Sequence, residues 1–277
     1  MKIKLIALDL DGTTLRKGGI LAPETKEILE TAIKKGIHVV VATGRVFSAL
    51  PESIFSIRGL EYIITSNGAH ITQLEEMKRI YSNYPSGEAI EKVKNLLFEH
   101  REYPIEVFTD GQAYIDEMIF ETIKVEGSDY MDANYIIKTR KPVSNIYDFL
   151  TKNKACIENI NIHFREFEHK AKLKEILEKQ QDITITSSMP HNLEIGGKNT
   201  SKANAIASLC ELIDIEETNV MAVGDSLNDQ AMIEKAGIGI AMGNAEKEIK
   251  DVADYVTLSN DENGVAYVVK KFVLDKL

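Results

Sequence analysis

Apolar residues in the first part of the chain gather into short runs separated by amphipathic stretches. Residues 3–10 are nearly all apolar, and residues 37–42 form a second such run. Runs of this kind are typical of strands buried on both faces of a parallel sheet. Between them, residues 23–36 have apolar positions at helical spacing and are bounded by Pro23 and Gly36, the usual marks of a helix start and stop. This order of elements predicts a doubly wound α/β sheet.

The pattern changes in the middle of the chain. We expect a helix over residues 47–57 and a third strand at residues 62–65, after which residues 86–188 alternate helices with more amphipathic strands. A short turn at Gly111 indicates antiparallel pairing of the strands on either side. The doubly wound pattern resumes with a helix at residues 203–213.

This change predicts two domains. Residues 1–83 and 190–277 are expected to form a Rossmann-like doubly wound core, and residues 84–189 an α+β domain inserted into it. A chain of 277 residues is long enough for both.

Charge and composition exclude some classes of binding partner and cellular location. Acidic residues outnumber basic ones by 43 to 33, a balance that would repel a nucleic-acid backbone. No apolar stretch approaches the roughly 18 residues that span a membrane, and we expect no signal peptide. Cys156 and Cys210 form no CxxC pair, which favours two buried thiols in a reducing compartment. We therefore predict a cytoplasmic protein without nucleic-acid or membrane partners.

Candidate chemistry begins directly after the first predicted strand, with Asp9-Leu10-Asp11-Gly12-Thr13. In open α/β sheets ligands bind beyond the carboxyl ends of the strands, where two carboxylates so close in sequence can converge on one ligand. Gly12 lets the backbone turn sharply and expose N–H groups to an anion. The alternative is an ordinary Asp-Gly turn.

Two weaker signals follow the next two strands. Thr43-Gly44-Arg45 offers a hydroxyl and a guanidinium to phosphate oxygens, although Thr43 could simply cap a helix. Asn67, within Ser66-Asn67-Gly68, could donate to a phosphate or hydroxyl, and a plain Asn-Gly turn is the alternative.

Two more signals lie in the last third of the chain. Lys202 could neutralise phosphate charge; we favour it over the nearby Lys198 because it abuts an apolar helix, although an exposed lysine is the commoner outcome. Residues 224–229 (Gly-Asp-Ser-Leu-Asn-Asp) follow a strand, and Asp225 is a candidate Mg²⁺ ligand there. The same residues could form a helix cap, and Asp229 could do both.

All these signals except Lys202 follow strands of one predicted sheet, so they should gather at one edge. Together they make the chain resemble the haloacid dehalogenase superfamily over about residues 1–83 and 190–277. The segment from Asp9 to Thr13 resembles the first motif of that superfamily, Thr43 the second, Lys202 the third, and residues 224–229 the fourth.

The resemblance extends to a subgroup. The inserted segment is similar to the C2B type of cap domain. Thr43-Gly44-Arg45, Ser66-Asn67-Gly68 and Ala241-Met242-Gly243-Asn244-Ala245 resemble the Cof-type phosphatases of subfamily IIB. One departure is Ala203, because a glycine usually follows the lysine of the third motif.

The resemblance implies a Mg²⁺-dependent phosphatase that acts on small phosphate esters such as sugar phosphates. Asp9 would be the nucleophile that becomes an aspartyl phosphate, and Asp11 the general acid and base. The remaining implied roles are phosphoryl binding by Thr43 and Lys202, metal binding by Asp9, Asp11, Asp225 and Asp229, and substrate binding by Gly12, Gly44, Arg45, Asn67 and Asn228. Two alternatives stay open: a phosphohexomutase with the same core and cap, and a phosphosugar-binding regulator without turnover.

Overall fold

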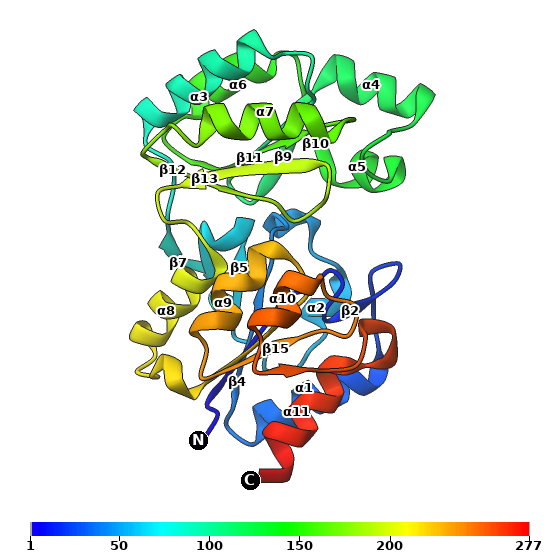
Figure 1. Cartoon of the computed structure of the whole chain (residues 1–277), viewed down its shortest axis with the longest axis vertical. Helices are drawn as coiled ribbons and strands as arrows, with labels where there is room; N and C mark the ends of the chain where they lie inside the picture. Colours follow the sequence, from blue (N-terminus) through cyan, green and yellow to red (C-terminus); the bar gives the residue numbers. More distant parts are fainter. Residues whose placement is uncertain (1, 277) are drawn as a thin grey trace. The chain divides into compact units, whose positions relative to one another are not determined.

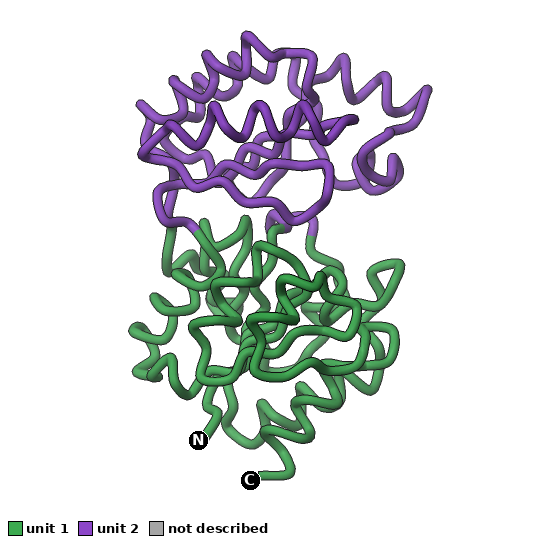
Figure 2. Tube along the Cα trace, in the orientation of Figure 1, with its two compact units in different colours: residues 1–44, 50–82, 201–277 green, residues 45–49, 83–200 purple. Residues whose placement is uncertain are grey.

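The computed structural model describes residues 2–276 and divides into two compact units (Figure 2). The core unit consists of the residues up to Gly44, Leu50–Ser82, and the residues from Ser201 onward. The inserted unit consists of Arg45–Ala49 and Asn83–Thr200. None of the helices between residues 2 and 276 combines the length and the apolar character needed to cross a bilayer.

The core unit is built on one eight-stranded sheet with helices along it, and strands β2 and β3 form a separate small hairpin (Figure 1). Its elements are β1 Leu5–Leu8, β2 Leu15–Arg16, β3 Ile20–Leu21, α1 Pro23–Lys34, β4 His38–Ala42, α2 Glu52–Phe55, β5 Tyr62–Thr65, β6 His70–Gln73, β7 Lys78–Ser82, α8 Lys202–Leu212, β14 Val220–Gly224, α9 Gln230–Lys235, β15 Ile238–Ala241, α10 Lys247–Val252, β16 Tyr255–Val256 and α11 Gly264–Phe272.

The sheet of the core unit runs in the order β16-β15-β14-β1-β4-β5-β6-β7. Its first six strands are parallel, whereas β6 and β7 add to the edge as an antiparallel hairpin. From β1 the chain fills one side of the sheet with β4 and β5, and later the other side with β14 to β16. The strand order therefore reverses between β1 and β14, and ligands bind beyond the carboxyl ends of strands at such a point.

Burial on both faces explains the unbroken apolar runs. Leu5 and Ala7 of β1 belong to the core cluster that also contains Ala205 and Leu209 of α8. The side chain of Ile6 must point to the opposite face, because residues alternate along a strand, and it is fully buried as well. The predicted doubly wound α/β fold is confirmed.

The expected helix over residues 47–57 is not continuous. A short 3-10 turn, Phe47–Ala49, is separated from α2 by Pro51, which precedes the first residue of α2. Proline lacks an N–H group and disfavours helical geometry at the residue before it, so the helix breaks there.

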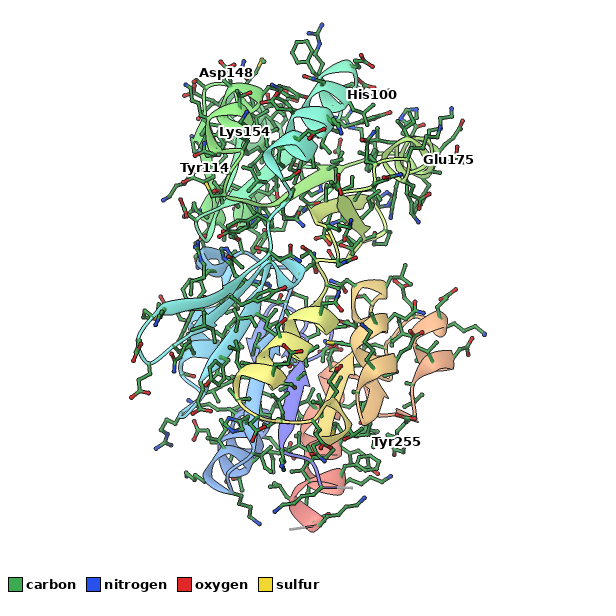
Figure 3. The ribbon with its side chains drawn as sticks, turned by 90° about the vertical axis from the view of Figure 1, so that its left-hand side faces the viewer. His100, Tyr114, Asp148, Lys154, Glu175 and Tyr255 are labelled. Carbon is green, nitrogen blue, oxygen red and sulfur yellow. The ribbon has the colours of Figure 1, made fainter. Side chains whose placement is uncertain are left out.

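The inserted unit is a six-stranded sheet in the order β10-β9-β8-β11-β13-β12. All its neighbouring strands are antiparallel except β9 and β10. Helices α3, α6 and α7 supply apolar side chains to the core cluster on one face. Tyr114, labelled in Figure 3, belongs to this face and lies against Phe149 with ring centroids 4.4 Å apart. Its elements are α3 Gly87–Glu99, β8 Ile105–Thr109, β9 Gln112–Asp116, α4 Glu117–Glu126, α5 Ala133–Thr139, β10 Arg140–Val143, α6 Ile146–Asn153, β11 Ile157–His163, α7 Phe167–Leu177, β12 Ile183–Thr186 and β13 Asn192–Gly197.

The inserted unit continues past residue 189, where we expected it to end. Strand β13 pairs with both β11 and β12, so the compact unit extends to Thr200. The sequence of β13, Asn-Leu-Glu-Ile-Gly-Gly, has only two apolar side chains and ends in two glycines, which are depleted in strands. Polar and apolar residues alternate over only four positions before the glycines, and we predicted no strand there.

Candidate active site

The carboxyl edge of the core sheet holds a cluster of buried charges centred on Lys202. Its ammonium group lies 2.6 Å from Oδ1 of Asp9 and 2.6 Å from Oδ1 of Asp229, and its side chain is fully buried. Asp9 directly follows β1, and Lys202 is the first residue of α8, whose N-cap is Ser201. Lys198, by contrast, belongs to the inserted unit and lies 3.7 Å from Asp182.

The segment after β14 supplies two further carboxylates. Asp229 accepts hydrogen bonds at Oδ2 from the backbone N–H groups of Asp225 and Ser226, at 3.0 and 3.1 Å. Together with Ser226 it forms a capping box, so the helix-cap interpretation of this segment is correct. Asp229 takes part in both the helix cap and the charged cluster, because its Oδ1 also accepts a hydrogen bond from Lys202.

Asp225 lies beside the loop that follows Asp9. The hydroxyl of Thr13 donates to its Oδ1 at 2.8 Å. A Cβ atom on Gly12, whose φ is 79°, would lie 2.4 Å from its Oδ2. Only a glycine fits between this backbone and the Asp225 carboxylate.

Burial and like charges shift the pKa values of this cluster. Burial, then Asp229, raise the pKa of Asp9 well above its ordinary range, and Lys202 offsets only part of this. Burial and Asp229 raise the pKa of Asp225 to about 6. Burial by itself would lower the pKa of Lys202, but Asp229 and Asp9 outweigh it and raise that pKa.

The charge balance of the cluster fits a bound cation. Three carboxylates, from Asp9, Asp225 and Asp229, face one ammonium, and one ligand atom from each lies within 4.8 Å of the others. Hard carboxylate oxygens are the ligands that divalent cations such as Mg²⁺ prefer. Oδ2 of Asp9 and Oδ2 of Asp225 lie outside the hydrogen bonds described above, so these two residues are best placed to hold the ion.

The other predicted site residues divide into two groups. Thr43 and Asn67 are buried in the core unit, and Asn67 Oδ1 accepts a 2.9 Å hydrogen bond from Asn228. Gly44 lies against the same side chain, because a Cβ atom there would be 3.1 Å from Asn67 Oδ1. Arg45 belongs to the inserted unit and donates to the carbonyl oxygen of Ala49 at 2.9 Å.

Asp11 is exposed, two residues beyond the buried Asp9. This difference suits two roles: the buried carboxylate is held in place by Lys202, whereas the exposed one lies within reach of solvent.

Three residues to which the sequence analysis gave no role complete the edge. Thr13 holds Asp225, and Thr14 donates from its hydroxyl to the carbonyl oxygen of Asp9 at 2.6 Å. Asn244 donates to the carbonyl oxygen of Gly12 at 2.8 Å. Asn244 lies in a segment that the sequence analysis had used only for the family resemblance. Because it comes shortly after the end of β15, its position at the carboxyl end of a strand could have given it a role as well.

A doubly wound sheet with buried aspartates, a lysine and hydroxyl groups at its carboxyl edge defines an α/β enzyme. The family model of the haloacid dehalogenase-like hydrolases matches residues 6–269. The chain therefore belongs to the haloacid dehalogenase-like hydrolase family, and both the predicted family and the predicted class of enzyme, a hydrolase of this type, are confirmed.

Relatives cover nearly the whole chain. Phosphatase YwpJ of Bacillus subtilis (strain 168) is 36% identical over 97% of this chain and 99% of its own length. The 5-amino-6-(5-phospho-D-ribitylamino)uracil phosphatase YcsE of the same organism is 32% identical over 98% and 96%. Among solved structures, a haloacid dehalogenase-like hydrolase from B. subtilis has a TM-score of 0.85 at 32% identity, covering 98% of this chain and 100% of that one. The similarity therefore includes the inserted unit as well as the core unit.

Proposed function

We propose that this protein is a Mg²⁺-dependent phosphatase that hydrolyses small phosphate monoesters through a phosphorylated Asp9. The observation that carries the proposal is the buried contact between Asp9 and Lys202, at the point where the strand order of the core sheet reverses. A carboxylate fixed beside an ammonium group has both a nucleophile and a positive charge for phosphoryl oxygens in one place. The relatives named phosphatases support this choice of reaction.

The proposed reaction has two steps. An oxygen of the Asp9 carboxylate attacks phosphorus, the bond from phosphorus to the ester oxygen breaks, and Asp11 gives its proton to the departing alkoxide. Water then attacks the same phosphorus, Asp11 takes a proton from it, and the bond to Asp9 breaks. Inorganic phosphate leaves, and both carboxyl groups return to their starting state.

Two residues are proposed to bind the phosphoryl oxygens. Lys202 offers a fixed ammonium, and Thr43, buried directly after β4, offers a hydroxyl at the same edge of the sheet. Phosphoryl transfer depends mainly on positioning and charge stabilisation, so rigid donors are well suited to it.

Mg²⁺ would be held by the carboxylates of Asp9 and Asp225, with the carbonyl oxygen of Asp11 as a further ligand. When bound, it would neutralise negative charge of the carboxylates and of the phosphoryl group. Asp229 would position Lys202 and the segment that carries Asp225, because its two oxygens accept hydrogen bonds from Lys202 and from backbone N–H groups.

We further propose that the inserted unit acts as a cap, which selects the leaving group and excludes water. Sugar phosphates and related phosphometabolites are the proposed substrates, and Gly12, Gly44, Arg45, Asn67 and Asn228 the proposed substrate-binding residues. A cytoplasmic location fits the two cysteines, Cys156 and Cys210, which are free thiols.

The test is a screen of the full chain with Mg²⁺ over sugar phosphates, nucleotides and phosphorylated cofactors, including a phosphorylated ribitylaminopyrimidine. Release of inorganic phosphate by the wild type, its loss in Asp9→Asn and its retention in Asp214→Asn, a change at an exposed aspartate, would support the proposal. An isomeric ester without free phosphate would indicate a phosphomutase. Tight binding without turnover would indicate a regulator, and either result would overturn the proposal.

A further inference from the structure

The turn that follows β5 has an unusual backbone. Ser66, Asn67 and Gly68 have φ angles of 50°, 55° and 100°, all in the left-handed half of conformational space. Such angles are uncommon for residues other than glycine, although asparagine tolerates them better than most. A conformation of this kind persists only where the surrounding structure holds it, and such positions concentrate at functional sites.

The side chain of Asn67 links this turn to the segment after β14. Its Oδ1 accepts from Nδ2 of Asn228 at 2.9 Å, and both side chains are buried. The other end of the Asn228 amide is held too, because the hydroxyl of Ser226 donates to its Oδ1 at 3.0 Å. The Asn228 amide group is thus fixed from both sides.

The backbone of the turn links to two other parts of the edge. The N–H of Asn67 donates to the carbonyl oxygen of Thr43 at 3.0 Å. Gly68 lies directly against the residue before Lys202, since a Cβ atom on it would be 2.2 Å from the carbonyl oxygen of Ser201. One turn of three residues therefore contacts the segments that carry Thr43, Lys202 and Asn228.

We infer that Asn67 is a positioning residue of the phosphoryl-transfer site, which acts through Asn228 rather than by binding the substrate itself. This inference rests on the proposed function. It replaces the substrate-binding role proposed for Asn67, because the side-chain Oδ1 and the backbone N–H of this residue both contact neighbouring segments of the site, at Asn228 and at Thr43. The left-handed backbone aims the side chain at Asn228 while its N–H holds the Thr43 carbonyl, so the two segments keep one relative arrangement.

A double-mutant cycle in the full chain tests this inference. Asn67→Gly removes the side chain and keeps the left-handed backbone accessible, and Asn228→Ala removes its partner. We expect each single change to lower kcat/KM for acetyl phosphate by about 10- to 100-fold, the usual effect of removing a group that orients a ligand of the site. In the Asn228→Ala background, Asn67→Gly should lower kcat/KM by less than about a further threefold, because the side chain through which Asn67 acts is already absent.

A matched control is Asn263→Gly, at another left-handed asparagine of the core unit, whose side chain contacts Arg16 and Glu24. It should leave kcat/KM unchanged within about twofold, since surface changes away from such sites have small effects. If Asn67→Gly does not fold, Asn67→Ser, whose side chain is too short to keep the contact with Asn228, takes its place in the cycle.

If the loss of kcat/KM in the double variant equals the product of the two single losses, the inference is overturned, and Asn67 contacts the substrate independently. A single variant with wild-type kcat/KM would overturn it as well. Failure of the proposed function has a different signature, because the wild type itself would then not hydrolyse acetyl phosphate. In that case the cycle is measured on binding of inorganic phosphate by calorimetry, where coupled losses still support the inference and multiplied losses, or no binding by the wild type, overturn it.

Discussion

Replacing Lys202 by methionine removes the ammonium group from the buried cluster and keeps the length of the side chain. Lys202 contacts two carboxylates at 2.6 Å each with no exposure to solvent. Breaking one buried ion pair by removal of a partner typically costs about 3–5 kcal/mol, because the remaining charge stays buried without a partner. Here two carboxylates lose one shared partner.

Protonation limits the cost. The pKa of Asp9 is already raised by burial and by Asp229, so Asp9 can bind a proton once Lys202 is gone. We therefore expect Lys202→Met to lower the free energy of unfolding by about 3–5 kcal/mol at pH 8. A group whose folded-state pKa is raised contributes less to stability as the pH rises through that value, so the deficit should shrink as the pH falls through the raised pKa of Asp9.

The assay is urea unfolding of the full chain in the presence of a chelator, followed by circular dichroism at pH 8 and pH 5. Lys198→Met is the control. Lys198 is exposed and lies 3.7 Å from Asp182, and exposed ion pairs of this kind contribute about 0–1 kcal/mol to stability. Phosphatase activity should fall by at least about 100-fold in Lys202→Met and stay near wild type in Lys198→Met. Equal stabilities of wild type and Lys202→Met at pH 8, or a larger loss of activity in Lys198→Met, would refute the reasoning.

Three further predictions concern the metal, the acid/base group and the inserted unit. Chelator-treated protein should be inactive and recover with millimolar Mg²⁺, because Asp9 and Asp225 repel each other without a cation; full activity in the chelator, measured as phosphate release, would contradict this. Asp11→Asn should give a burst of p-nitrophenol from p-nitrophenyl phosphate and then turn over slowly, since this leaving group needs no proton but the attacking water still needs a base; linear release in stopped-flow traces would argue against the assigned role. In the inserted unit, burial alone would raise the pKa of Glu106, but the neighbouring Arg140 guanidinium and His163 ring outweigh it and lower that pKa to about 2 from an ordinary 4.5. The Glu106 carboxylate therefore contributes on the order of 3 kcal/mol above pH 4.5, which is lost as the pH falls from 4.5 to 2, and Glu106→Gln should flatten this part of the stability profile in acid-unfolding curves.

The strands that build the centre of the core sheet were predictable because burial on both faces leaves an unbroken apolar run, as in residues 5–8 of β1. Strand β13 was not, because it carries Asn192, Glu194 and two glycines, and its identity as a strand comes from pairing with β11 and β12. The hairpin of β6 and β7 was missed for a similar reason, since β7 is exposed along much of its length and has no apolar pattern.

The residues of the candidate site also divide into those that local sequence patterns predict and those that depend on tertiary contacts. Asp9, Asp225 and Asn67 were found because each lies within two residues of the end of a strand in one sheet. The contact of Lys202 with Asp9, across 193 positions of sequence, needs the packing of α8 against the sheet, which no local pattern contains. The position of Arg45 depends on tertiary contacts too: it follows Thr43 and Gly44 in sequence, but its guanidinium binds the Ala49 carbonyl and lies over Tyr135 in the inserted unit. No spacing rule could have separated Arg45 from its two neighbours.

The antiparallel hairpin at one end of the core sheet has a consequence for self-association. A sheet edge exposes unpaired backbone groups that can template strand pairing with another molecule, and lysines and bulges discourage such pairing. The edge strand β7 carries exposed Lys78 and Arg79, and its register with β6 shifts between Ile71 and Thr72. At the opposite end, β16 is only two residues long. Charged residues and a register shift hinder strand pairing between copies at the β7 edge, and the short length of β16 hinders it at the other edge. Both features protect the core sheet from forming fibrils.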